Sequence, residues 1–210
     1  MNVGSKEYFD EVAKEWDSIR KGFFSEAVRE KAYSVAGVEN GKLAADIGAG
    51  TGFITEGLVQ QGLQVIAVDR SQVMLDEMRA KLADSVLVDC RVGEAASLPV
   101  ADNAVDYAFA NMYIHHVESP PEAIREMARI LKPGGKLVIT DLDEHDFEFL
   151  RTEQHDHWLG FRRDDIRQWF KEAGLQNVVV DYVGESCCSQ SECGCASASV
   201  SIFVASGEKQ

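Results

Sequence analysis

The sequence predicts an α/β fold with a doubly wound sheet, and three observations support this. A glycine-rich turn at residues 46–52 directly follows the apolar run 43–45 and precedes a helical pattern that begins at Phe53. Strand-like apolar runs then alternate with amphipathic helical patterns along the chain. The last two strand-like runs, 178–183 and 199–205, have no helix between them, so we expect them to pair antiparallel.

Each helical pattern has an apolar face at helical spacing. The three sets are Met74, Leu75, Met78 and Leu82; Ile124, Met127, Ala128 and Leu131; and Ile166, Trp169, Phe170 and Ala173. Residues 119–122, Ser-Pro-Pro-Glu, predict a helix start with an N-cap serine, prolines in the first turn and a capping-box glutamate. Between helices, strands are expected at 63–68 and 136–140.

Two further amphipathic patterns precede the sheet. Phe9, Val12, Ala13 and Trp16 share one face, and Val28, Ala32 and Val35 share another. We therefore expect one domain over residues 1–210, made of a helical N-terminal part (1–40) and an α/β core (41–210). From these residues alone, we expect the two helices to pack on the core.

The charge and hydrophobicity of the chain argue against two classes of binding partner. The chain has 35 acidic and 21 basic residues and a net charge of −14, so a polyanion would be repelled and we expect no nucleic-acid partner. No run approaches the roughly 20 apolar residues of a membrane span, and the first residues lack the apolar core of a signal peptide. We expect a cytoplasmic protein with no membrane partner; the oligomeric state stays open.

The glycine-rich turn predicts a nucleotide-like ligand. Its glycines permit close backbone approach, and the helix that follows offers free N–H groups. Asp69, at the end of the next strand, suits ribose hydroxyls. A glycine-rich turn followed by an acidic residue at the end of the next strand fits either a nicotinamide cofactor or S-adenosylmethionine. A dinucleotide fingerprint needs G-x-G-x-x-G, but Phe53 stands where the third glycine should be, and Gly52 comes one position early. The spacing favours S-adenosylmethionine.

Five ordered motifs resemble those of the class I S-adenosylmethionine-dependent methyltransferases, in particular the small-molecule branch that includes ubiquinone/menaquinone and arsenite methyltransferases. Residues 46–52 resemble the first motif, 65–69 the second, 93–99 the third, 106–111 the fourth, and 131–135 the turn before the fifth strand. The resemblance implies a Rossmann-like seven-stranded sheet with a terminal antiparallel hairpin. It also implies S-adenosyl-L-methionine as the cofactor and an N-terminal helical lid over it.

The resemblance also implies individual cofactor contacts. Glu94 and the next backbone N–H would read the adenine, and Trp16, which stands where that branch usually has tyrosine, would contact the methionine part. The expected cofactor-binding residues are Asp46, Gly48, Ala49, Gly50, Gly52, Asp69, Arg70, Met74, Glu94, Ala95, Asn111 and Trp16.

The five histidines all fall between residues 115 and 157, on loops expected at the carboxyl ends of strands, where open α/β sheets bind ligands. His115 and His116 are packing residues or acceptor contacts, and we take His116 as the candidate catalytic residue. His145, His155 and His157 are either solvated or bind substrate or metal; their spacing matches no metal template. A general base is needed only if the acceptor must lose a proton.

Four of five cysteines, Cys187, Cys188, Cys193 and Cys195, lie between the two final strands. We expect reduced thiols on a loop at the cofactor face, because no secretory signal precedes them. Thiolates bind soft ions such as zinc, copper(I) or trivalent arsenic, so we predict one ion held by at least two of these cysteines. The alternative is a flexible Ser/Cys/Gly-rich loop over residues 185–201.

The sequence thus predicts an S-adenosylmethionine-dependent methyltransferase acting on a small molecule, with a thiol-bound metalloid such as arsenite as the specific acceptor. It departs from arsenite methyltransferases at residues 111–113, Asn-Met-Tyr, where they carry a cysteine. The alternative is a non-catalytic sensor that binds S-adenosylmethionine or a metal with the same fold. A nicotinamide oxidoreductase is disfavoured by the glycine spacing.

Overall fold

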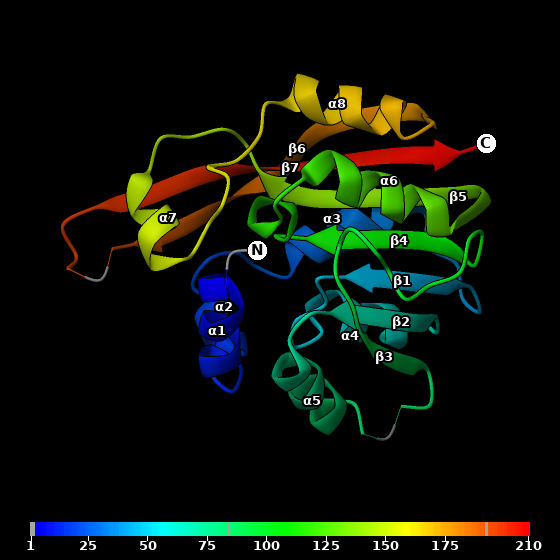
Figure 1. The fold of residues 1–210 in the computed structure, drawn as a ribbon, viewed down its shortest axis with the longest axis horizontal. Coiled ribbons are helices and arrows are strands. Elements are labelled where there is room, and N and C mark those ends of the chain that lie inside the picture. The colour runs from blue at the N-terminus through cyan, green and yellow to red at the C-terminus, as the bar shows by residue number, and fades with distance from the viewer. Residues whose placement is uncertain (1–2, 84, 192) are drawn as a thin grey trace.

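A computed structural model describes residues 3–83, 85–191 and 193–210, which contain one seven-stranded sheet in the order β3-β2-β1-β4-β5-β7-β6 (Figure 1). The neighbours from β3 through β5 are parallel, whereas β7 is antiparallel to both β5 and β6. This confirms the doubly wound sheet and its terminal antiparallel hairpin. The strands are β1 Leu43–Ile47, β2 Gln64–Asp69, β3 Val88–Val92, β4 Val105–Asn111, β5 Leu131–Leu142, β6 Leu175–Gln190 and β7 Ser197–Lys209.

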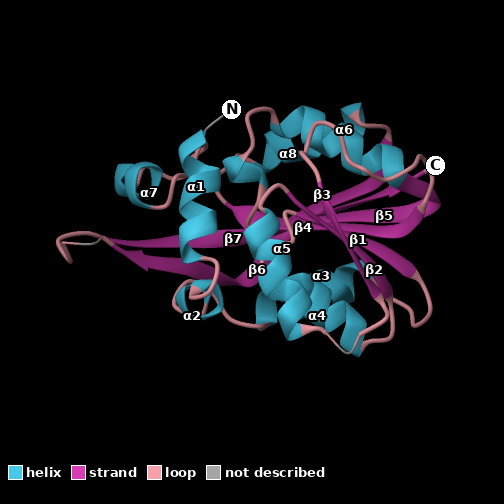
Figure 2. Cartoon of the chain, turned by 60° about the horizontal axis from the view of Figure 1, so that its bottom comes forward, coloured by secondary structure: helices cyan, strands magenta, loops and turns pink. Residues whose placement is uncertain are grey.

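Helices cover both faces of the sheet (Figure 2). Apolar side chains of α6 and α8 pack on one face, and those of α3 and α4 pack on the other. The predicted helix faces supply these contacts: Ile124, Met127, Ile166 and Phe170 are each fully buried. The helices are α1 Val3–Val12, α2 Trp16–Arg20, α3 Ala27–Ala36, α4 Phe53–Gln60, α5 Gln72–Lys81, α6 Pro120–Ile130, α7 Glu148–Glu153 and α8 Arg163–Glu172, with a short 3₁₀ helix, η1, at Ile114–His116.

The N-terminal helices stand beside the carboxyl ends of the central strands (Figure 1). The predicted helical face from Phe9 to Trp16 is divided between α1 and α2, because residues 13–15 form a turn. Asp10 and Asp17 fasten this segment to the core through Ser71 Oγ (2.5 Å) and Lys81 Nζ (2.6 Å). Residues 1–2 of the predicted lid lie outside the described residues. Among the described helices, none has the length and apolarity needed to cross a membrane.

The C-terminal hairpin is much longer than predicted. Beyond the predicted strands, pairing continues from Ser186↔Ser201 to Gln190↔Ser197 after a register shift that follows Tyr182. Its glycine, serine and cysteine residues have weak strand propensity, so pairing with the facing strand decides their conformation. The hairpin end consequently projects beyond the sheet, past α1 and α2 (Figure 2).

Helix α6 begins where the sequence predicts, with Ser119 at the N-cap and prolines in the first turn, but the predicted side-chain cap is absent. The Ser119 side chain makes no capping hydrogen bond. Its backbone carbonyl accepts the N–H groups of Glu122 and Ala123, both at 3.1 Å, and Pro120 needs no partner because it has no N–H. The Ser119 side chain is therefore free to face the cavity described next.

Candidate active site

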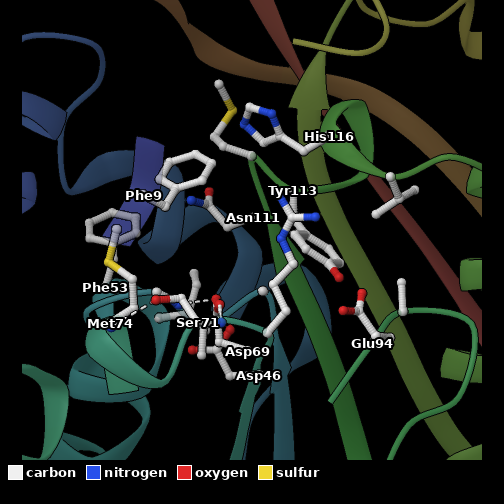
Figure 3. Close-up of a pocket in the computed structure, with 18 of the residues that line it drawn as sticks. Phe9, Asp46, Phe53, Asp69, Ser71, Met74, Glu94, Asn111, Tyr113 and His116 are labelled. Atoms are coloured by element: carbon white, nitrogen blue, oxygen red, sulfur yellow. Dashed lines mark hydrogen bonds between the residues drawn. The ribbon is translucent and has the colours of Figure 1, made fainter. Parts of the chain in front are cut away.

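A cavity of about 890 Å³ lies at the carboxyl ends of β1, β2 and β4, beside α1 and α2 (Figure 3). Aromatic residues from α1 and α2 line it together with polar groups from the strand ends. Of the predicted cofactor residues, the structure brings together Asp46, Gly48, Ala49, Gly50, Asp69, Arg70, Met74, Glu94, Ala95, Asn111 and Trp16, and His116 also lines the cavity. Gly52 is not among the lining residues.

The three glycines of the turn have different roles. All have positive φ, +70° at Gly48, +53° at Gly50 and +95° at Gly52. A Cβ at Gly48 would lie 2.1 Å from the Tyr113 ring, and one at Gly52 would lie 2.8 Å from Met78 Cγ. A Cβ at Gly50 would instead point into open space, with Trp16 Nε1 nearest at 3.9 Å. Of these three glycines, Gly50 keeps ligand space open, whereas the missing side chain of Gly52 makes room for α5; cofactor contact by Gly52 stays a prediction.

Two carboxylates are held rigidly at the strand ends. Asp46 Oδ2 accepts hydrogen bonds from the Thr55 backbone N–H (3.0 Å) and hydroxyl (2.6 Å), which fastens β1 to α4. Burial raises the pKa of Asp46 to about 7. Asp69 accepts one backbone N–H on each oxygen, from Gly50 and Ser71, both at 2.8 Å. Burial also raises the pKa of Asp69. Its remaining lone pairs are available to ligand hydroxyls.

Arg20, which the sequence did not single out, lines the same cavity from α2. It is only 5% exposed, and its Nη2 lies 3.1 Å from Glu26 Oε1. Its guanidinium carbon lies 4.0 Å from the Phe53 ring centroid. Within the described part of the chain, its Nε and Nη1 are buried without a hydrogen-bond partner. Such groups are costly unless an anion pairs with them. The spacing of Trp16 and Arg20, four residues apart on one helical face, is the signal that could have revealed it.

His116 lies near Phe9 at another side of the cavity (Figure 3), with ring centroids 5.1 Å apart. Its Nδ1 is 3.3 Å from the carbonyl oxygen of His155. Burial and then the charge of His115 lower the pKa of His116 well below its usual range. Burial would also lower the pKa of His115, but the carboxylates of Asp141 and Asp156 raise it to about 9.

The four hairpin cysteines do not form the cluster of reduced thiols that the sequence predicts. Cys193 and Cys195 form a disulfide, so they offer no thiolates, and the expectation of four reduced thiols is wrong here. Cys187 and Cys188 are free, but consecutive strand residues point to opposite faces. Burial, then the charge of Asp156, raises the pKa of Cys187 to about 12. None of the four lines the cavity.

Comparisons with known proteins agree with this geometry. Residues 45–139 match the family described as "Methyltransferase domain". A demethylmenaquinone methyltransferase of Renibacterium salmoninarum is 33% identical over 147 residues, which cover 69% of this chain and 61% of that protein. The 2-methyl-6-phytyl-1,4-hydroquinone methyltransferase of Spinacia oleracea is 30% identical over 172 residues, 79% of this chain and 49% of that protein. The chain thus spans about half to three fifths of these relatives' length.

The crystal structure of the YcgJ protein of Bacillus subtilis has the same fold, with a TM-score of 0.73 and 17% identity over 87% of this chain and 98% of that one. Both chains share the Rossmann-like sheet with antiparallel C-terminal strands. Together with the sequence matches, this identifies residues 45–139 as a methyltransferase domain of the class I S-adenosylmethionine-dependent kind.

Proposed function

We propose that this chain transfers the methyl group of S-adenosylmethionine to a small-molecule acceptor bound in the same cavity. The lining of the cavity is the main observation behind this proposal. Asp69, Glu94 and the glycine turn line one part, and Phe9 and His116 line another. Donor and acceptor would meet in one space, and holding two reactants in line supplies much of the acceleration that such a displacement needs.

The cofactor pose in this proposal follows from the available polar groups. Asp69 accepts hydrogen bonds from the ribose hydroxyls, and Glu94 with the backbone N–H of Ala95 reads the adenine. The unpartnered nitrogens of Arg20 suit the carboxylate of the methionine part, because a charge-assisted hydrogen bond satisfies a buried guanidinium. Trp16, beside Gly50, covers that part of the cofactor.

His116 is the acceptor-side catalytic residue in this proposal. It lies beside Phe9 and lines the cavity. Because its imidazole is neutral at physiological pH, it can contact an acceptor without repelling the positively charged sulfonium of the cofactor.

We propose a trivalent metalloid such as arsenite as the acceptor, with Cys187, the less exposed of the two free hairpin thiols, as its protein ligand. The backbone N–H of Cys188 donates to the carbonyl of Phe23 at 2.9 Å, and the Phe23 ring lies 6.3 Å from the Trp16 ring. The strand that carries the free thiols therefore adjoins the N-terminal helical segment. During transfer, the metalloid lone pair forms the bond to the methyl carbon. The sulfur–methyl bond breaks and its electron pair stays on S-adenosylhomocysteine, so no proton has to be removed.

An acceptor panel tests this assignment. The reduced chain is incubated with S-adenosylmethionine and either arsenite or a 1,4-hydroquinone, and S-adenosylhomocysteine is measured by mass spectrometry. We expect turnover with arsenite that is lost in Cys187→Ser/Cys188→Ser and kept in Cys90→Ser, a free cysteine on β3. Turnover with the hydroquinone alone would overturn the assignment of a metalloid as the acceptor, and would favour the class of acceptor for which the relatives are named. No product with either would favour the non-catalytic sensor.

A further inference from the structure

Behind the cavity, two histidines and an aspartate place their ligand atoms together. One nitrogen each from His115 and His116 and one carboxylate oxygen of Asp156 all lie within 4.8 Å of one another. The Asp156 oxygen is 3.7 Å from His115 Nε2 and 4.0 Å from His116 Nδ1. The 3.7 and 4.0 Å separations do not exceed twice the usual zinc–ligand distance of about 2.0–2.2 Å, and small side-chain rotations would bring all three donors within reach of one ion.

Asp141 orients the first of these donors. Its Oδ1 is 2.6 Å from His115 Nδ1, and its Oδ2 accepts the backbone N–H groups of Tyr113 (3.2 Å) and Ile114 (3.0 Å). Asp141 is itself fully buried. With Nδ1 engaged by this carboxylate, Nε2 of His115 is the nitrogen left for a ligand. Metal-binding histidines are typically oriented by a carboxylate in this way.

The loop that carries Asp156 is fixed against η1. The backbone N–H groups of His157 (3.0 Å) and Trp158 (2.9 Å) both donate to the carbonyl of His115, and Trp158 Nε1 donates to the carbonyl of Val117 at 2.9 Å. The three donors come from segments about forty positions apart, and these hydrogen bonds hold them together without a ligand. A preformed donor set loses little conformational entropy when an ion binds.

The Asp156 carboxylate is buried against the two imidazoles. It is 4% exposed, and its ion-pair distances are 3.7 Å to His115 Nε2 and 4.0 Å to His116 Nδ1. Asp141 places a second carboxylate on the far side of His115. Buried charges are normally paired or bound to metal, and a divalent cation between the imidazoles would balance these two carboxylates.

We propose that His115, His116 and Asp156 form a binding site for a divalent transition-metal ion such as Zn²⁺. Two imidazoles and a carboxylate are ligands that zinc accepts, and three protein ligands leave a fourth position open. His116 also lines the cofactor cavity, so the open position adjoins it. Ion binding needs neither the cofactor nor turnover. A test can therefore refute the metal site while the methyltransferase proposal stands, or refute the methyltransferase proposal while the metal site stands.

The test titrates the whole reduced chain with Zn²⁺ alone by calorimetry and with Co²⁺ alone by absorption spectroscopy. We expect one ion per chain with a tetrahedral cobalt spectrum. Asp156→Asn and His115→Asn should weaken binding by at least roughly tenfold, and Asp141→Asn by about 10–100-fold. His145→Asn, a neighbouring histidine outside the donor set, serves as the matched control and should bind as the parent does.

S-adenosylmethionine affinity is measured on each variant to confirm that it folds. Retained cofactor binding with lost ion binding in Asp156→Asn supports the site. Parent-like ion binding in Asp156→Asn would overturn it, as would no bound Zn²⁺ in the parent chain. A cobalt–thiolate charge-transfer band that disappears in Cys187→Ser but persists in His115→Asn would also overturn it, because the ion would then sit at the hairpin thiols.

Discussion

Replacing Arg20 with methionine should separate cofactor binding from stability. In the proposed pose, Arg20→Met removes at least one charge-assisted hydrogen bond to the methionine carboxylate. Such a bond is worth about 1.5–3 kcal/mol, so S-adenosylmethionine should bind about 10–150-fold more weakly. The free protein loses an ion pair to Glu26, whose side chain is 50% exposed, and the stacking of the guanidinium on the Phe53 and Phe24 rings. Because two buried, unpartnered N–H groups also disappear, the unfolding free energy should change by no more than about 1 kcal/mol.

Arg29 is the matched control. Its guanidinium carbon lies 5.2 Å from the centroid of the same Phe53 ring, but its charge is already matched by Glu26, Glu30 and Glu56 within 2.8–3.7 Å. Arg29→Met should therefore lower the unfolding free energy by about 1–3 kcal/mol and leave cofactor affinity unchanged. Calorimetry should show weakened cofactor binding for Arg20→Met alone, and thermal unfolding should show a clear loss of stability for Arg29→Met alone.

The carboxylate contact itself is isolated with decarboxylated S-adenosylmethionine. The parent should bind this analogue about as weakly as Arg20→Met binds S-adenosylmethionine. Arg20→Met should bind the analogue and S-adenosylmethionine with nearly equal affinity. Arg20→Met that binds S-adenosylmethionine within about twofold of the parent would refute the assignment. Equal losses for both ligands would also refute it, since the effect would then not depend on the carboxylate.

Three further outcomes follow from the cavity. Asp69→Ala should weaken S-adenosylmethionine binding by about 1–3 kcal/mol, because ribose hydroxyls lose their acceptor; unchanged calorimetric affinity would remove Asp69 from that role. Gly50→Val should abolish cofactor binding, because its side chain would fill the ligand space, and should also lower the melting temperature, because a β-branched residue is strained at a φ of +53°; Gly48→Ala should lower the melting temperature because its Cβ would lie 2.1 Å from an aromatic ring, and a Gly50→Val variant with parent-like cofactor affinity would contradict this assignment. Reducing the Cys193–Cys195 disulfide should leave cofactor affinity unchanged, as titration under reducing conditions would show.

The parts of the site that local sequence dictates could be predicted. The glycine turn and the start of α4 are neighbours in the chain, and Asp69 ends the next strand, so their order and spacing alone indicate a strand–turn–helix ligand site. Gly52 shows the limit of this reasoning, because a glycine pattern does not reveal what a side chain would meet. Its missing Cβ makes room for Met78, which is 26 positions away in sequence.

Features that depend on tertiary contacts could not be predicted. His115 and Asp156 are 41 positions apart, and only the packing of the loop after α7 against η1 brings them together. Arg20 resembles any surface arginine of an amphipathic helix until the fold buries it beside Phe53. The cysteine cluster predicted one site, but strand alternation separates Cys187 from Cys188 and the hairpin end joins the other two.

The central claim is methyl transfer within one cavity, and a single-turnover experiment tests it most directly. Reduced protein in excess is mixed with S-adenosylmethionine labelled with ¹³C in its methyl group, and with arsenite. Both products are then followed by mass spectrometry. Our account predicts that S-adenosylhomocysteine and the labelled acceptor appear together at the same rate, and that both are lost in Gly50→Val, whose side chain would fill the ligand space. Bound S-adenosylmethionine recovered intact, with no label on any acceptor, would contradict it.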